Sequence, residues 1–166
     1  SSDVYKRQIQ HMSDLSATLD GKEIIAKRID VDGVRVTGVR NASKLVITYR
    51  LLAAEMTCRA NHLDSTHVHI MPPYTWMLPT RGVEENRIDG QHIVKLIAPK
   101  EWHTATQLEG KEGSWVANGR DEFLDAIMES NSNEMITFDV MGTKQHLKLW
   151  DSGGLPIPEK GLNRLI

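Results

Sequence analysis

Residues 44–52 read KLVITYRLL, and this stretch predicts a β-strand with one buried face. The side chains of a strand point alternately to the two faces of a sheet, so every second residue shares a face. One face holds Leu45, Ile47, Tyr49 and Leu51, whereas the other holds Val46, Thr48 and Arg50. We therefore expect a fold built around strands.

The segments on both sides of this stretch extend the β pattern. Residues 22–39 contain two runs of β-branched residues around the turn Asp30-Val31-Asp32-Gly33, which predicts a hairpin. Residues 51–59, LLAAEMTCR, have high helix propensity, and either a short helix or a further strand fits them. Residues 66–71, THVHIM, predict a strand that ends at Pro72-Pro73.

Two more hairpins are predicted in the second half of the chain. Residues 84–98 form one around the turn Asp89-Gly90, because this dipeptide favours the tight turns that join antiparallel strands. Residues 135–140 and 145–150 form the other. Trp150 ends the last strand, and we assign it to the core.

One helix is predicted over residues 120–130. Asn118 or Gly119 can cap its start, and Asp121 and Glu122 lie in its first turn, where the positive end of the helix dipole favours acidic groups. Its apolar stripe consists of Phe123, Leu124, Ala126, Ile127 and Met128. Many strands with one helix predict a mainly β fold, either an antiparallel β-sandwich or an α+β domain.

The chain has 166 residues, which favours one domain. We expect residues 1–11, SSDVYKRQIQH, to be a disordered or non-native leader, and residues 12–166 to form a single β-rich domain. No run of about 18 apolar residues predicts a membrane span. No signal peptide is recognised, which favours the cytoplasm, or the periplasm if a signal has been removed.

Charge and cysteine content narrow the class of protein. Lys and Arg number 20 against 22 Asp and Glu, and the net charge of −2 excludes a global basic field, so nucleic acid is not the expected partner. Cys58 is the only cysteine, so no intramolecular disulfide can form. Cys58 with a nearby histidine could act as a nucleophile, but a lone cysteine beside an apolar run more often packs as a small hydrophobe.

His67 and His69 form the strongest candidate for a metal site. Residues two apart on a strand project to the same face, so two imidazoles can converge on one ion such as zinc. We take His103 as the third ligand; His62, His92, Asp64 and Glu101 remain alternatives. The competing interpretation is a solvated pair on an outer strand face.

Tyr74 and Trp76 form the candidate binding surface. They lie in PPYTWMLPTRG, residues 72–82, where three prolines and a glycine predict an ordered loop. Tryptophan supplies rigid contact area and is enriched at binding hot spots. The competing interpretation is that Trp76 anchors the loop on the sheet.

Several segments resemble the VasI-like small β proteins associated with type VI secretion. The similar segments are RIDGQ at 87–91, Trp102, Glu109-Gly110, Phe123-Leu124, MITFDV at 135–140 and LKLWDSGGLP at 147–156, with LVITYR at 45–50 as an earlier core strand. The resemblance implies a β-sandwich accessory or binding module without enzymatic activity, and it carries over no site residues.

The sequence lacks the G-x-S-x-G, G-x-x-x-x-G-K-[ST], H-E-x-x-H and G-x-G-x-x-G motifs. We therefore predict a non-enzymatic binding or accessory module without a cofactor, which recognises a protein partner or small ligand through Tyr74 and Trp76. The alternative is a metal-dependent enzyme or metal-binding protein that uses the His-x-His pair.

Overall fold

Strand β5 (Leu45–Leu51) forms where the alternating sequence predicts it. Its inner face carries the partly buried Ile47, Tyr49 and Leu51, while Val46, Thr48 and Arg50 are exposed. The computed structural model describes residues 12–29, 33–39, 42–57, 59–81, 86–87 and 90–150. The chain divides into two units, residues 1–53 and residues 54–166.

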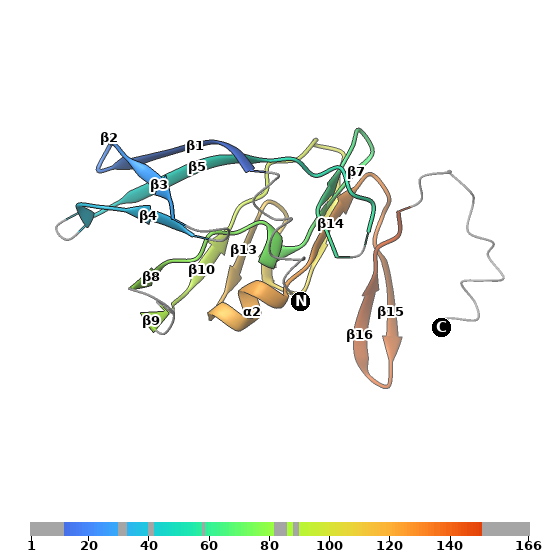
Figure 1. The fold of residues 1–166 in the computed structure, drawn as a ribbon. Helices are drawn as coiled ribbons and strands as arrows, with labels where there is room; N and C mark the ends of the chain where they lie inside the picture. Colours follow the sequence, from blue (N-terminus) through green and yellow to red (C-terminus); the bar gives the residue numbers. More distant parts are fainter. Residues whose placement is uncertain are drawn as a thin grey trace. The chain divides into compact units, whose positions relative to one another are not determined.

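The first unit contains a three-stranded antiparallel sheet and a separate hairpin. In the sheet, β5 pairs with β1 (Met12–Leu19), and β1 pairs with β2 (Lys22–Ile24). The hairpin joins β3 (Ala26–Arg28) to β4 (Val34–Val36), as Figure 1 shows. The hairpin predicted over residues 22–39 is thus confirmed for β3 and β4, while β2 joins β1 instead; residues 30–32 and the predicted leader, residues 1–11, lie outside the described residues.

The second unit has two larger antiparallel sheets. The four-stranded sheet has the order β11-β14-β7-β6, and the three-stranded sheet has the order β10-β13-β12. Their strands are β6 (His62–Leu63), β7 (His67–Ile70), β10 (His92–Val94), β11 (His103–Thr106), β12 (Glu109–Lys111), β13 (Ser114–Ala117) and β14 (Met128–Asn131).

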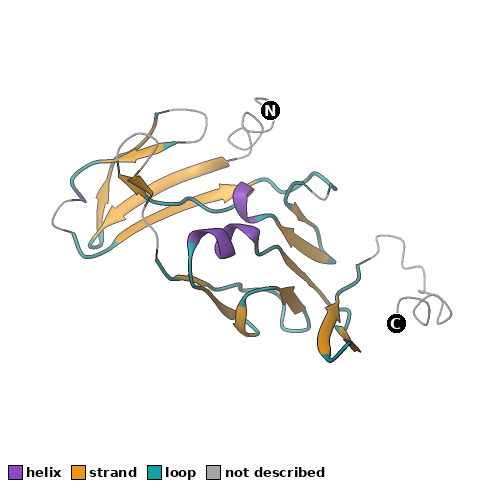
Figure 2. Ribbon diagram, turned by 90° about the horizontal axis from the view of Figure 1, so that it is seen from below, coloured by secondary structure: helices purple, strands orange, loops and turns teal. Residues whose placement is uncertain are grey.

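Short elements complete the second unit. β8 (Thr80–Arg81) pairs with β9 (Asn86–Arg87), and β15 (Ile136–Val140) pairs with β16 (Thr143–Leu147). The last predicted hairpin thus forms, but its second strand ends at Leu147 and not at Trp150. The helix α2 (Arg120–Asp125) lies beside the 3-10 turn η2 (Pro72–Tyr74), and both are drawn in purple in Figure 2. The mainly β fold class is confirmed. None of the helices in the described ranges is long and apolar enough to span a membrane.

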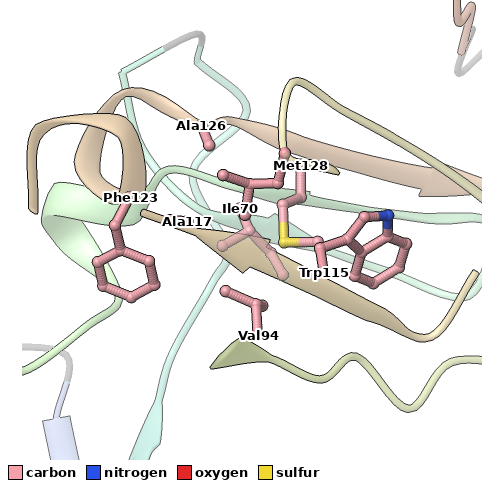
Figure 3. Packing of buried hydrophobic residues seen from close by; sticks show 8 residues of the cluster. Ile70, Val94, Trp115, Ala117, Phe123, Ala126 and Met128 are labelled. Carbon is pink, nitrogen blue, oxygen red and sulfur yellow. The ribbon is translucent and has the colours of Figure 1, made fainter. Parts of the chain in front are cut away.

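The core of the second unit takes side chains from both larger sheets and from α2 (Figure 3). Met128 is the largest fully buried residue in the described part of the chain, with 1% of its surface exposed. The cluster consists of Ile70, Val94, Leu108, Trp115, Ala117, Phe123, Ala126 and Met128. The prediction of one domain over residues 12–166 stays a prediction.

The helix predicted over residues 120–130 is too long. Helix α2 ends at Asp125, and residues 128–131 form β14, the strand between β7 and β11. Met128 and Ser130 lie on one face of β14 and are fully buried, while Glu129 and Asn131 lie on the other face, opposite His69 and His67. Pairing with strands on both sides outweighs local helix propensity here, because propensity is only a weak preference.

The hairpin predicted over residues 84–98 is also wrong. β9 pairs with β8, and β10 pairs with β13, which comes later in the chain. Hydrogen bonding with β13 places Val94 beside Trp115, and both residues belong to the core. A hairpin closed at Asp89-Gly90 would not by itself bring these two residues together. Residues 51–59 were expected to form a short helix or a further strand. Of these, residues 52–57 and 59 form neither, and they pair with a strand only through the isolated bridge between Ala54 and His62.

Candidate functional site

The four-stranded sheet has one polar face, which carries all the histidines of β6 and β7. His67 and His69 are two residues apart on β7 and share a face, and the register places Glu129 opposite His69 and Asn131 opposite His67. His62 on β6 also pairs with His69. The opposite face of β7 and β14 carries Ile70 and Met128 and packs into the core.

Glu129 joins the two β7 histidines. Its Oε1 atom lies 2.9 Å from His67 Nδ1, and its Oε2 atom lies 3.2 Å from His69 Nδ1. Burial raises the pKa of the Glu129 carboxyl, but hydrogen bonds from His69, His67 and Asn131 outweigh burial and hold the pKa below its ordinary value. Glu129 is therefore an ionised acceptor, and both histidines donate their Nδ1–H groups to it.

His67 lies at the centre of an aromatic group. Its Nε2 atom is 2.5 Å from His62 Nδ1, and both residues are buried. Trp150 stacks on the His67 ring with the centroids 3.5 Å apart and the planes 8° from parallel. Because Nδ1 of His67 donates to Glu129, its Nε2 carries the lone pair, and that lone pair faces His62.

Asp64 organises the turn between β6 and β7. Its Oδ1 atom accepts hydrogen bonds from Thr66 Oγ1 at 2.7 Å, from Thr66 N at 2.7 Å and from His67 N at 3.1 Å. The hydrogen bonds from the Thr66 side chain and backbone lower the pKa of Asp64 to about 2. An exposed, ionised carboxylate thus stands beside the buried histidines, and ligand-type atoms of His62, Asp64 and His67 all lie within 4.8 Å of one another.

The segment after β16 is fixed against this site. Asn131 and Asn133 donate their side-chain amides to the carbonyl of Leu149, at 3.3 Å and 2.9 Å. Lys148 Nζ donates to the carbonyl of Asn131 at 3.2 Å and to that of Asn133. Trp150 Nε1 donates to Thr66 Oγ1 at 2.9 Å, so this segment touches the β6–β7 turn directly.

The predicted metal ligands are placed in two groups. His67 and His69 meet at Glu129, whereas His103 is exposed on β11 opposite Asn131, with strand β14 between it and His67. His62 and Asp64, which the sequence offered as alternatives to His103, lie next to His67 instead. Cys58, the candidate nucleophile, lies outside the described residues.

The loop with Tyr74 and Trp76 is held by Asn61. The Asn61 side chain accepts from Met71 N at 2.7 Å and from Thr75 Oγ1 at 3.0 Å, and it donates to the carbonyl of Tyr74 at 3.2 Å. Trp76 is partly buried against the core, and its ring lies 5.8 Å from that of Phe123. Tyr74 is partly exposed in η2. The loop is therefore ordered, with Trp76 as an anchor on the sheet side.

Sequence reasoning missed Glu129 and Trp150 as members of the site. Glu129 falls in the stretch predicted as helix, and Trp150 was assigned to the core. The structure instead places Trp150 on His67, outside the apolar cluster. One local signal could have indicated that Glu129 belongs to the site. It is a strand pattern over residues 128–131, in which Glu129 faces away from Met128.

The fold resembles that of a solved protein from Idiomarina loihiensis, described as an aminopeptidase N family protein. The TM-score is 0.72 at 19% sequence identity, and the match covers 84% of this chain and 24% of that one. This chain thus spans about a quarter of the length of that protein. At this identity the likeness concerns the fold alone.

A family model identifies the chain more closely. Residues 5–128 match the Peptidase M61 N-terminal domain, and the chain belongs to that family. No curated protein matches the chain. The resemblance to VasI-like proteins is wrong, because most of the chain is accounted for by this other family. Within the described residues, the segments that suggested it lie in strands, in a helix and in the loops between them, which are features that unrelated β domains share.

Proposed function

We propose that this chain is a non-catalytic accessory domain that binds peptide segments next to the catalytic part of a peptidase. The observation that carries the proposal is the match of residues 5–128 to a domain defined as the N-terminal part of a peptidase family. The similar solved protein is described as an aminopeptidase family protein, and this fold occupies 24% of its chain. A role in holding substrate is consistent with an N-terminal β domain of such a protein.

The chemistry of the described residues supports a binding role over a catalytic one. The H-E-x-x-H motif of many zinc peptidases is absent from the sequence. The predicted third ligand, His103, lies on β11, and strand β14 separates it from His67 on β7, so the described residues do not bring the predicted set of three histidines together. The alternative of a metal-dependent enzyme built on the His-x-His pair therefore has less support.

Tyr74 and Trp76 are the proposed contact residues for the peptide. Three hydrogen bonds of Asn61 fix their loop, so binding loses little loop entropy. Trp76 gives the loop a rigid base against Phe123, and Tyr74 offers an aromatic face with a hydroxyl group. Such a surface suits peptide side chains better than an anionic polymer.

Peptide binding tests this function directly. A pool of fluorescein-labelled decapeptides with free N-termini is titrated with the chain and followed by anisotropy, and chromatography detects any cleavage. We expect dissociation constants of about 10–100 µM and no cleavage, with or without added zinc. Tyr74→Ala should weaken binding about tenfold, as expected for loss of an aromatic anchor.

The control variant is Ile97→Ala, because Ile97 is 99% exposed and lies outside the loop. It should leave binding unchanged. The proposal fails if no peptide binds at about 1 mM protein, if Ile97→Ala and Tyr74→Ala weaken binding equally, or if the purified chain cleaves the peptides.

A further inference from the structure

We propose that His62, Asp64 and His67 form a binding site for a divalent metal ion, with zinc as the ion that their chemistry favours. These residues lie at the turn between β6 and β7, and one ligand-type atom from each lies within 4.8 Å of the others. The site differs from the set of His67, His69 and His103 that the sequence suggested. It is also independent of the loop that carries Tyr74 and Trp76.

The two imidazoles already converge on one point. His62 Nδ1 and His67 Nε2 are 2.5 Å apart, which is shorter than the roughly 2.7–3.2 Å of ordinary hydrogen bonds to nitrogen donors. Zinc–nitrogen bonds of about 2.0–2.1 Å in tetrahedral geometry hold two ligand nitrogens about 3.3 Å apart. The rings therefore need to separate by less than about 1 Å to accept the ion between them.

Asp64 supplies the third ligand. Its Oδ1 atom is occupied by the two Thr66 donors and His67 N, while Oδ2 accepts no hydrogen bond from the described part of the chain. The turn thus fixes the position of the carboxylate without using its second oxygen. Because Asp64 is exposed, a water molecule can reach the fourth position of a tetrahedral site.

The surroundings of His67 support metal binding. Histidine ligands of metal ions usually donate their other ring N–H to a carboxylate, which fixes the tautomer and orients the ring. Glu129 Oε1 accepts this bond from His67 Nδ1 at 2.9 Å, and Trp150 stacks on the ring. The negative charges of Asp64 and Glu129 together match the double positive charge of the ion.

The donor set selects the kind of metal. Two imidazole nitrogens and one carboxylate oxygen suit zinc and its neighbours in the transition series, whereas calcium and magnesium prefer oxygen ligands only. Cobalt(II) can occupy the same tetrahedral geometry and is coloured, so it serves as a spectroscopic probe. Bound metal would link β6, β7 and the turn between them, next to the Trp150 ring that stacks on His67.

Metal binding is measured on the chain after removal of any affinity tag, by competition with a chromophoric zinc chelator and by the visible spectrum with Co²⁺. We expect one equivalent of zinc with a dissociation constant of about 1 µM or below. We also expect the intense absorption of tetrahedral cobalt, and a change in tryptophan fluorescence that Trp150→Phe removes.

Asp64→Asn is the decisive variant. An asparagine side-chain oxygen can still accept the turn hydrogen bonds but brings no charge to the ion, so we expect zinc affinity to fall at least tenfold. Asp139→Asn is its matched control, because Asp139 Oδ1 accepts from Gly142 N at 2.8 Å in the exposed β15–β16 turn. This control should change zinc affinity less than twofold.

A second pair of variants compares a proposed ligand with a histidine outside the site, and circular dichroism checks that the variants fold. His62→Asn should lower zinc affinity about a hundredfold while circular dichroism stays unchanged, and His103→Asn should keep the affinity of the parent chain. The proposal is overturned if the tag-free chain binds less than about a tenth of an equivalent of zinc at micromolar free metal. It is also overturned if Asp64→Asn and Asp139→Asn behave alike, or if His103→Asn loses zinc to the same extent as His62→Asn. None of these results depends on peptide binding.

Discussion

Trp150 stacks on His67 with the ring centroids 3.5 Å apart and the planes 8° from parallel. Its indole nitrogen also donates to Thr66 Oγ1 at 2.9 Å. One side chain thus connects the segment after β16 to the turn between β6 and β7, across 84 residues of sequence. The contact helps to keep His67 buried beside His62 and Glu129.

Trp150→Ala should therefore destabilise the second unit. Loss of an aromatic pair and of its partly buried area is expected to lower the free energy of unfolding by about 1–2 kcal/mol. Trp150→Phe keeps a ring over His67 but lacks the indole N–H, so it should lose less than half as much. Urea denaturation followed by circular dichroism measures both changes, and equal losses for the two variants would contradict the stacking argument.

Thr104 joins the buried Ser130 to the exposed Glu112 in a polar network. Its Oγ1 atom lies 2.6 Å from Glu112 Oε1 and 3.0 Å from Ser130 Oγ, and its backbone N–H donates to Glu112 Oε2 at 2.9 Å. Ser130 is fully buried, so Thr104→Val leaves its hydroxyl without this partner. We expect a loss of about 1–3 kcal/mol in the free energy of unfolding.

Thr137→Val is the matched control for this loss. Thr137 is exposed on β15, and its hydroxyl contacts the exposed His146 at 3.0 Å. Because water can replace that contact, we expect a change within about 0.5 kcal/mol. The same denaturation experiment compares the two threonine variants.

Gly110 is required by a close backbone approach. Its φ angle is +154°, and a Cβ atom there would lie 2.4 Å from Ser114 O and 2.7 Å from Trp115 Cα. Gly110→Ala should therefore cost more than about 2 kcal/mol, because β12 cannot keep its place beside β13. Gly142→Ala, with φ +82° and nothing within 4 Å of the added carbon, should cost about 1 kcal/mol. Thermal melts of the two variants test this order.

Lys148 gives a pH dependence of stability. Burial lowers the pKa of its ammonium group from 10.5, and the nearby Glu129 and Glu112 offset only part of this effect. Between the lowered folded-state pKa and 10.5 the unfolded chain binds more protons, so the free energy of unfolding contributed by Lys148 rises with pH. That contribution is lost as the pH falls through the folded-state pKa.

Lys148→Arg isolates this effect, because arginine stays charged throughout the range. The free energy of unfolding of the parent chain, minus that of Lys148→Arg, should rise as the pH increases through the lowered folded-state pKa toward 10.5. Urea denaturation at several pH values measures this difference. A flat or falling difference would contradict the lowered pKa.

Local periodicity explains which strands could be predicted. Strand β5, the β3–β4 hairpin, β7 and the β15–β16 hairpin have alternating or β-branched sequences of their own, and all four form. Strand β14 was predicted as the end of a helix, because Met128 follows a good helix start at Arg120. Its buried position between β7 and β11 decides its conformation, and the local sequence does not indicate that these two strands are its neighbours.

The candidate site was predictable only in part. The spacing of His67 and His69 places both on one face, but spacing does not specify what meets them there. His62 and Asp64 remained two of several alternatives. They lie near His67 only because residues 62–70 form the β6–β7 hairpin. Tyr74 and Trp76 remain predicted contact residues, although the packing of Trp76 against the core favours an anchoring role for its ring.

The sequence by itself determined a mainly β chain with His67 and His69 on one side of a strand, because alternation along a strand is a local property of the backbone. Only the tertiary structure decided that Glu129, 62 and 60 residues away, lies between these histidines and that Trp150 covers one of them. Strand order and register set these contacts, and both depend on which distant segments bury the most apolar surface together. The proposed metal ligands lie in the local β6–β7 hairpin, and the distant Glu129 and Trp150 add a hydrogen bond and a stacked ring to His67.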